Sequence, residues 1–236
     1  MAKVTFGTGS SIMMNIGNNR VASKNGLVNA VAWVLNGKPT YGLEGITNFT
    51  GATIAWLQNQ LGLINSPQES QQLAESVPDN GGVTLVPSFV GLGAPYWKAE
   101  VTGAVFGLTP GVKKEHLVRA ALEGIAFTIT DVLTVMKQDA GIPLTRLHAD
   151  GGAVRNRFLM QFTADINQLE LYVSILPELS ALGAVFSGGL ATGLYQGLDA
   201  LEVIDTGVQV FYPAMSADQI ESLYAGWNGA IRRLLV

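Results

Sequence analysis

The dipeptide Asn36-Gly37 constrains the fold of this chain more than any other short feature, because it separates two β-prone segments at residues 27–35 and 40–46. Both residues tolerate positive φ, which a two-residue turn between antiparallel strands requires. A further extended segment, residues 4–15, is interrupted by a glycine-rich run at 7–11. The chain is therefore predicted to begin as an antiparallel sheet.

Helical periodicity follows this sheet. One helix is predicted over residues 51–61, and a second begins at Ser66, which can cap it, with Glu69 completing a capping box. The strongest pattern predicts a long helix over residues 113–138. Its apolar side chains recur at three- and four-residue spacing: Leu117, Ala121, Ile125, Ile129, Val132 and Met136.

The second half of the chain alternates between strand-like and helical segments. Residues 146–149 and 169–173 are predicted to be strands, with a helix over 156–166 between them. Residues 181–195 predict a helix rich in glycine and alanine, which we expect to be buried because small side chains permit close approach of another backbone. After a last helix that begins near Ser216, the pattern as a whole predicts one mixed α/β domain over residues 1–236.

Composition excludes several functional classes. Only 14% of the 236 residues are charged and the net charge is -4, so there is no basic field to attract nucleic acid or an anionic membrane. The chain has no cysteine and two histidines, which excludes disulfides and thiolate metal sites and argues against a histidine-rich zinc site. No apolar run approaches the ~20 residues of a spanning helix. We expect a cytoplasmic protein.

Two glycine-rich loops could bind a phosphate group. Residues 7–11 (GTGSS) offer consecutive amides and hydroxyls beside a β segment, and residues 150–153 (DGGA) lie between a predicted strand and a predicted helix. Glycines let backbone N–H groups approach phosphate oxygens, and helix N-termini favour anions. Each loop taken alone is more simply interpreted as a tight turn of no catalytic meaning, because glycine clusters serve turns more often than ligands.

The remaining polar residues predict no catalytic group and no metal site. Asp131, Asp139, Asp150 and Asp165 are scattered, without the spacing of paired acid and base groups or of metal ligands. His116 is expected to cap a helix or face solvent, and His148 to be packed or hydrogen-bonded. The aromatic residues Phe89, Tyr96 and Trp97 are compatible with core packing or with a stacking platform.

Three longer motifs resemble the FGGY family of carbohydrate kinases, and within it most of all the glycerol kinases. Residues 89–97 read FVGLGAPYW, similar to the segment FxGLGAPYW. Residues 103–108 (GAVFGL) and, after seven residues, 116–123 (HLVRAALE) fit the family's second signature. Residues 150–156 (DGGAVRN), followed by FLMQF, resemble its adenosine segment. The resemblance runs nearly end to end.

The resemblance implies a ribonuclease H-like domain of the actin-like ATPase fold. A full kinase of this family has two such domains with ATP in the cleft between them, and this chain is similar to the C-terminal one only. Carried over by position, the residues implied to contact the nucleotide are Thr8 at the phosphates, Gly51 and Gly152 against the nucleotide, and Asn156 at the adenosine end.

The resemblance also implies what this chain does not contain. The family's catalytic aspartate belongs to a Gly-Asp-Gln-Gln segment before the position of Ala2, so we expect the N-terminal substrate domain, with most Mg²⁺ ligands, to be missing and the chain alone to be inactive. Ala55 stands where glycerol kinases usually have glutamine, and Ser11 where a phenylalanine lines the substrate. A hydroxyl at Ser11 suits glycerol less than a longer or more hydroxylated polyol or ketose.

Two other interpretations remain open from the sequence. The chain could be an actin-like ATP-binding scaffold or regulatory module without a small-molecule substrate, or a truncation product that forms only oligomer contacts.

Overall fold

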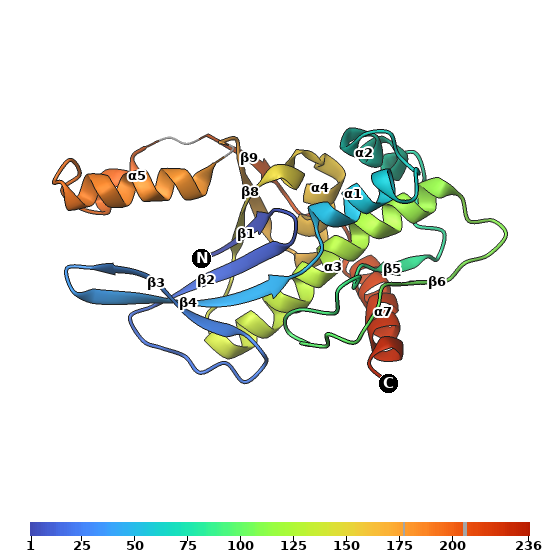
Figure 1. The fold of residues 1–236 in the computed structure, drawn as a ribbon, viewed down its shortest axis with the longest axis horizontal. Coiled ribbons are helices and arrows are strands. Elements are labelled where there is room, and N and C mark those ends of the chain that lie inside the picture. The colour runs from blue at the N-terminus through green and yellow to red at the C-terminus, as the bar shows by residue number, and fades with distance from the viewer. Residues whose placement is uncertain (177, 205–206) are drawn as a thin grey trace.

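The computed structural model describes residues 1–176, 178–204 and 207–236. Seven strands of this part form one mixed sheet in the order β3-β4-β2-β1-β7-β8-β9 (Figure 1). Strand β1 is parallel to β7, and β7 to β8, whereas the other neighbours are antiparallel. The strand bounds are β1 Ala2–Phe6, β2 Ser10–Gly17, β3 Val28–Leu35, β4 Lys38–Thr47, β7 Arg146–Asp150, β8 Glu170–Ser174 and β9 Val208–Phe211.

The predicted antiparallel start is confirmed. Leu35 pairs with Lys38, so Asn36 and Gly37 form the two-residue turn between β3 and β4. Their φ values are 50° and 72°, the left-handed values that this turn requires. A small second sheet pairs β5 (Thr84–Val86) with β6 (Ala104–Phe106).

Helix α3 runs along the large sheet and contacts β2 and β4, and α4 contacts β8 and β9 (Figure 1). The helix bounds are α1 Gly51–Asn59, α2 Pro67–Glu75, α3 Lys114–Ala140, α4 Arg157–Asn167, α5 Leu179–Ala191, α6 Asp199–Glu202 and α7 Ala217–Leu234, with a short 3₁₀ helix, η1, at Gly152–Arg155. The buried side chains of β1 and β2 alternate along each strand, which places one face of the sheet against these helices. The stripe predicted on α3 is fully buried apart from Leu117, which is partly buried.

One detail of the helix starts differs from the prediction. The Ser66 side chain accepts a hydrogen bond from Glu69 N, as expected for a cap. The Glu69 carboxylate, however, accepts from the backbone and side-chain nitrogens of Asn65 (2.6 and 2.8 Å) rather than from the backbone of Ser66. The Asn65 side chain adds a second donor at that position, so the carboxylate reaches one residue further back.

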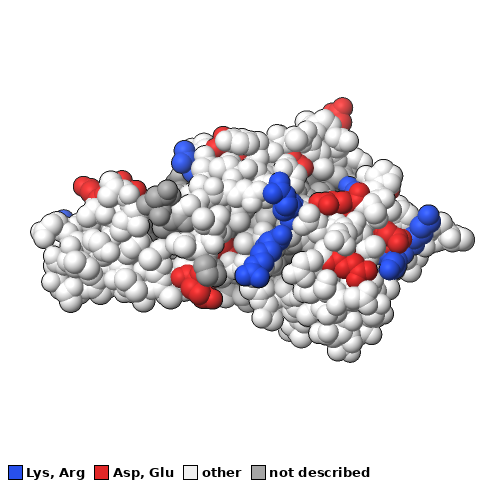
Figure 2. All heavy atoms as spheres, turned by 90° about the horizontal axis from the view of Figure 1, so that it is seen from above, with Lys and Arg blue, Asp and Glu red and all other residues white. Residues whose placement is uncertain are grey.

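The prediction that the glycine-rich helix is buried is wrong. Helix α5 projects from the sheet beside the β3–β4 hairpin (Figure 1), and within it only Gly189 is buried. Small side chains permit close packing but do not supply a partner, and a Cβ added at Gly183 or Gly188 would meet no atom of the described chain within 4 Å. A groove of about 690 Å³ separates α5 from the hairpin, and Figure 2 shows this end of the molecule largely free of charged side chains.

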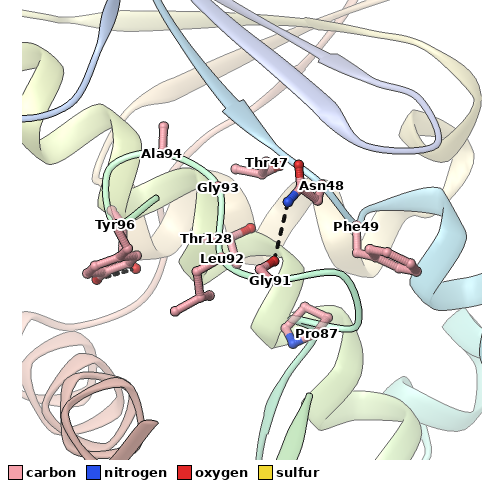
Figure 3. Close-up of a pocket in the computed structure, with 11 residues that line it drawn as sticks. Thr47, Asn48, Phe49, Pro87, Gly91, Leu92, Gly93, Ala94, Tyr96 and Thr128 are labelled. Carbon is pink, nitrogen blue, oxygen red and sulfur yellow. Dashed lines mark hydrogen bonds between the residues drawn. The ribbon is translucent and has the colours of Figure 1, made fainter. Parts of the chain in front are cut away.

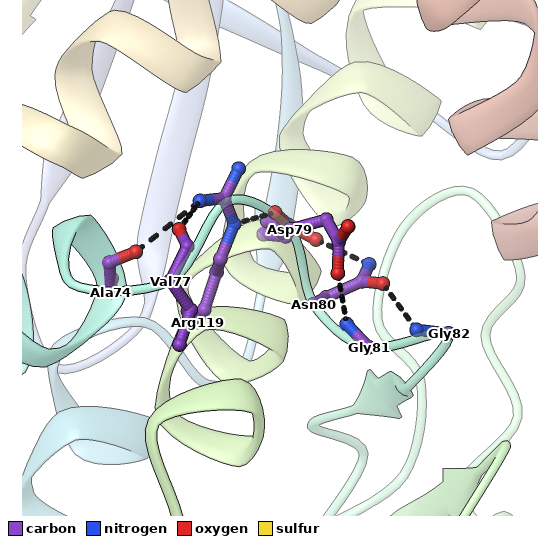
Figure 4. A network of polar contacts seen from close by, with 8 residues as sticks. Ala74, Val77, Asp79, Asn80, Gly81, Gly82 and Arg119 are labelled. Carbon is purple, nitrogen blue, oxygen red and sulfur yellow. Dashed lines mark hydrogen bonds and ion pairs between the residues drawn. The ribbon is translucent and has the colours of Figure 1, made fainter. Parts of the chain in front are cut away.

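Helix α3 carries two buried carboxylates, eight residues apart. Glu123 is 2% exposed and accepts from Arg119 Nε (2.9 Å) and Asn80 Nδ2 (2.7 Å), in a network where Arg119 also donates to the Val77 carbonyl (Figure 4). Asp131 is 4% exposed and accepts from Tyr96, Tyr224 and Trp227. Burial raises the pKa of both groups, and that of Asp131 to about 6, although their donors partly oppose the shift.

The raised pKa of Asp131 predicts how stability changes with pH. Because the folded state binds this proton more tightly than the unfolded state, the free energy of unfolding should rise as the pH falls from 7 to 5, by about 1 kcal/mol from this group. Urea denaturation of the wild-type chain and of Asp131→Asn at both pH values measures this. The variant should be less stable at pH 7 and should lack this part of the gain; an unchanged gain would contradict the assignment.

Candidate functional site

The loop between β1 and β2, residues 7–9, is held by the start of α1. The amides of Thr50 and Ala52 donate to the Thr8 carbonyl (2.9 and 3.1 Å), and the Gly51 amide donates to the Gly7 carbonyl (2.9 Å). The first amides of a helix have no partner within the helix, so here they bind the loop. We call residues 7–9 the Gly-Thr-Gly loop.

Two glycines allow this close packing. A Cβ at Gly51 would lie 2.7 Å from the Gly7 carbonyl oxygen, and a Cβ at Gly9 would collide with the Thr47 carbonyl. The Ser10 and Thr50 hydroxyls are hydrogen-bonded across the same contact at 2.7 Å. The Gly-Thr-Gly loop therefore rests directly on backbone, while the Thr8 side chain is exposed.

The second glycine loop lies beside the first. Because β1 and β7 are parallel neighbours, their carboxyl ends deliver both loops to the same edge of the sheet. Gly151 has φ 99°, and a Cβ there would lie 2.5 Å from the Phe6 carbonyl oxygen. A Cβ at Gly152 would meet no described atom within 4 Å, so this residue faces open space.

The structure brings the four sequence-predicted residues together. Thr8, Gly51 and Gly152 line one cavity of about 530 Å³, with Ala55 and Gln58 on its α1 side. An adjoining cavity of about 200 Å³ shares Gly152 and is lined further by Gln68, Gln71, Arg155 and Asn156. Their convergence across nearly 150 residues of sequence gives a continuous groove along both glycine loops.

Asn156 has structural bonds in addition to its place in this groove. Its Oδ1 accepts from Leu159 N (2.9 Å), which caps α4, and its Nδ2 donates to Ser70 Oγ (3.0 Å). The side chain is 7% exposed. A ligand could therefore use only the second amide hydrogen or the second lone pair of Oδ1 of the Asn156 side chain.

Sequence reasoning missed two polar side chains of this region, Glu44 and Gln58. Ser11 Oγ donates to Glu44 Oε1 at 2.6 Å. Gln58 lines the main cavity one turn after Ala55, and its Nε2 donates to the Asn65 carbonyl. The i, i+3 spacing of Gln58 from Ala55 on a helix was the available signal, since such residues share one face.

The titratable groups near the loops are held in ion-pair or packing contacts. Asp150 is 3% exposed and pairs through Oδ2 with Lys3 Nζ at 2.9 Å, while its Oδ1 has no hydrogen-bond partner in the described chain. His148 stacks on Tyr172 at 5.4 Å, and burial lowers its pKa. His116 Nδ1 accepts from Lys113 N, which confirms the expected capping role.

Among the described residues, no group of three or more His, Cys, Asp or Glu could hold a metal ion, and no helix is long and apolar enough to cross a membrane.

The aromatic residues predicted as one group are separated in the structure. Phe89 packs against Phe49 and Trp56, Tyr96 binds Asp131, and the Trp97 indole donates to the Gly26 carbonyl.

The adjacent glycines of the second loop predict opposite tolerance to a methyl group. Gly151→Ala should lower the free energy of unfolding by about 2 kcal/mol or more, because it combines a positive φ with a collision against Phe6. Gly152→Ala, which faces open space, should stay within ~0.5 kcal/mol of the wild type. Urea denaturation of both variants checks this, and equal losses would show that the loop is wrongly placed.

Comparison with known proteins gives a consistent result. The model of the FGGY family of carbohydrate kinases, C-terminal domain, matches residues 2–192. A glycerol kinase of Francisella tularensis subsp. novicida is 46% identical over 233 residues, which cover 99% of this chain and 47% of that protein.

The structural comparison agrees. The crystal structure of Plasmodium falciparum glycerol kinase with ADP matches with a TM-score of 0.91 at 34% identity, over 100% of this chain and 47% of that one. A ligand-bound xylulose kinase from Lactobacillus acidophilus, at 22% identity and TM-score 0.87, shares the fold. The chain spans about half the length of the curated relatives it matches. The predicted actin-like, ribonuclease H-type fold is thereby confirmed, and the chain belongs to the FGGY family of carbohydrate kinases, as a C-terminal domain.

Proposed function

We propose that this chain is the nucleotide-binding half of an ATP-dependent sugar or polyol kinase, which transfers the γ-phosphate of ATP to a substrate hydroxyl. The observation that carries the proposal is the groove on which Thr8, Gly51, Gly152 and Asn156 converge. A groove that joins two glycine loops at the carboxyl ends of parallel strands suits a phosphate chain at one end and a nucleoside at the other.

The phosphates would lie against the Gly-Thr-Gly loop. The exposed Thr8 hydroxyl can donate to a phosphate oxygen, and Gly152 leaves room for the nucleotide because it has no side chain. Asn156, with Gln68 and Gln71 beside it, would face the adenosine end. The amides of Thr50, Gly51 and Ala52 already bind loop carbonyls, so they support the loop rather than the ligand.

Mg²⁺ would be held mainly outside this chain. The described residues include no cluster of acidic side chains that could hold a metal by themselves, and the carboxylate nearest the loops, Asp150, is paired with Lys3. A bound Mg²⁺ would supply positive charge that neutralises the charge developing on the transferred phosphoryl group. We propose that the phosphates and a companion domain supply its ligands.

The catalytic base would also come from a companion domain. Phosphoryl transfer needs a carboxylate that accepts the hydroxyl proton. His148, stacked in the sheet, and Asp150, paired with Lys3, are both committed to other contacts. The curated relatives are about twice as long as this chain, which leaves room for a second, cytoplasmic domain of similar size. The uncharged surface of α5 would then be available to it.

The acceptor is proposed to be glycerol or a related polyol or ketose. Ser11, on β2 two residues beyond the Gly-Thr-Gly loop, donates its hydroxyl to Glu44, so this part of the sheet presents a hydroxyl and a carboxyl group. Such a pair favours an acceptor with several hydroxyls.

Nucleotide titration tests the proposal directly. Isothermal titration calorimetry with ADP should give saturable binding with a dissociation constant on the order of 1 mM or below. This corresponds to a favourable binding free energy of about 4 kcal/mol or more. Gly152→Val should weaken binding at least tenfold without loss of stability, because its side chain enters open space that the nucleotide needs. Gly226→Val, on the exposed side of α7, is the matched control. Absence of ADP binding, or equal effects of both variants, would contradict the proposed site.

A turnover assay tests the division between domains. The 236-residue chain should show no ATP-dependent phosphorylation of glycerol or sugars, since general-base assistance alone supplies ~10²–10⁴-fold. The same chain joined to the N-terminal half of a glycerol kinase relative should phosphorylate a polyol or ketose. Nucleotide binding without any turnover in the joined protein would favour an ATP-binding scaffold.

A further inference from the structure

Asp131 connects distant parts of the chain. Its Oδ2 accepts from Tyr96 OH (2.9 Å) and from Trp227 Nε1 (2.8 Å), and its Oδ1 accepts from Tyr224 OH (2.6 Å). Tyr96 lies in the loop between β5 and β6, whereas Tyr224 and Trp227 belong to α7. This carboxylate lies in the middle of α3 and is not part of the nucleotide groove described above.

The loop that carries Tyr96 is tightly folded on itself. Leu92 and Lys98 exchange backbone hydrogen bonds, and the amides of Tyr96 and Trp97 both donate to the Gly93 carbonyl. A displacement of Tyr96 would therefore move the whole segment 91–98. We call this segment the 91–98 loop.

The 91–98 loop in turn contacts the end of β4. The Ala94 amide donates to the Ile46 carbonyl (2.9 Å), and Asn48 Nδ2 donates to the Gly91 carbonyl (3.3 Å; Figure 3). A Cβ at Gly93 would collide with that Ile46 carbonyl, so the two backbones are in direct contact. Two residues beyond Asn48, the Thr50 and Gly51 amides bind the Gly-Thr-Gly loop.

We propose that Asp131 is a positioning residue for the nucleotide site: through Tyr96 and the 91–98 loop it fixes residues 46–51, and through them the Gly-Thr-Gly loop. Every contact in this series is a hydrogen bond or a backbone packing contact, and the residues at its two ends, Asp131 and Thr50, are buried. The expected effect of Asp131 on ADP binding rests on the proposed function, whereas its expected effect on the Gly-Thr-Gly loop does not.

The two tyrosines that donate to Asp131, Tyr96 and Tyr224, allow a matched test. Tyr96→Phe and Tyr224→Phe each remove one hydroxyl donor from the same carboxylate, but only Tyr96 leads to the Gly-Thr-Gly loop. Tyr96→Phe should weaken ADP binding about three- to tenfold, and Tyr224→Phe less than twofold, at comparable losses of stability. Glu123→Gln, at the other buried carboxylate of α3, should change stability without changing ADP affinity.

A second measurement does not depend on the nucleotide. Hydrogen exchange of the Thr50, Gly51 and Ala52 amides reports directly on the bonds that hold the Gly-Thr-Gly loop. These amides should exchange several-fold faster in Tyr96→Phe than in Tyr224→Phe. Equal exchange in the two variants would overturn the proposal, as would equal ADP affinities. Absence of ADP binding by the unaltered chain, with the exchange difference present, would overturn the proposed function alone.

Discussion

The hydrogen bonds from the first amides of α1 to the carbonyls of Gly7 and Thr8 determine where the Gly-Thr-Gly loop lies. They use donors that a helix start always leaves without a partner, so they add no polar group that must be satisfied elsewhere. They also require the absence of a side chain at Gly51, since a Cβ would lie 2.7 Å from the Gly7 carbonyl. The β1–β2 turn, the end of β4 and α1 are consequently fixed relative to one another mainly by backbone contacts, to which the Ser10–Thr50 hydroxyl bond adds.

The position of these backbone groups depends on how the end of β4 is held. Strand β4 pairs with β2 on one side, and its last residues also contact the 91–98 loop. That loop is anchored to α3, which is buried along most of its length. A long buried helix is the most rigid element available in such a domain, so the loop contacts transfer the rigidity of the core to the edge of the sheet that carries the proposed nucleotide groove.

The sequence predicted features that depend on local spacing. The turn at Asn36-Gly37 follows from positive φ at two adjacent residues, and the buried stripe of α3 follows from helical periodicity. The two glycine loops were recognised singly, and the family resemblance supplied the reason to place them together. Their convergence follows from the parallel pairing of β1 with β7, which no local pattern encodes.

Features that depend on distant partners could not be predicted. Asp131 seemed an isolated acidic residue because its donors are 35 to 96 positions away. Asp165 likewise seemed an isolated acidic residue, yet it is 8% exposed and accepts from the Ala214 amide. The exposure of α5 was missed for the opposite reason: its composition describes a surface that can be packed closely, but whether a partner is present is not a property of the segment.

The openness of the nucleotide groove fits a domain that works with a second one. Thr8 and Gly152 lie at the surface, so water can reach any phosphate bound there, and each charge contact remains weak in that high dielectric. Closing a cleft over the same groups would strengthen these charge contacts. The structure of this domain would not have to change, because the site is already held rigidly by backbone and by α3. In the proposed kinase, this chain would therefore contribute a preformed surface for the nucleotide, and the companion domain would contribute both the catalytic base and the exclusion of water.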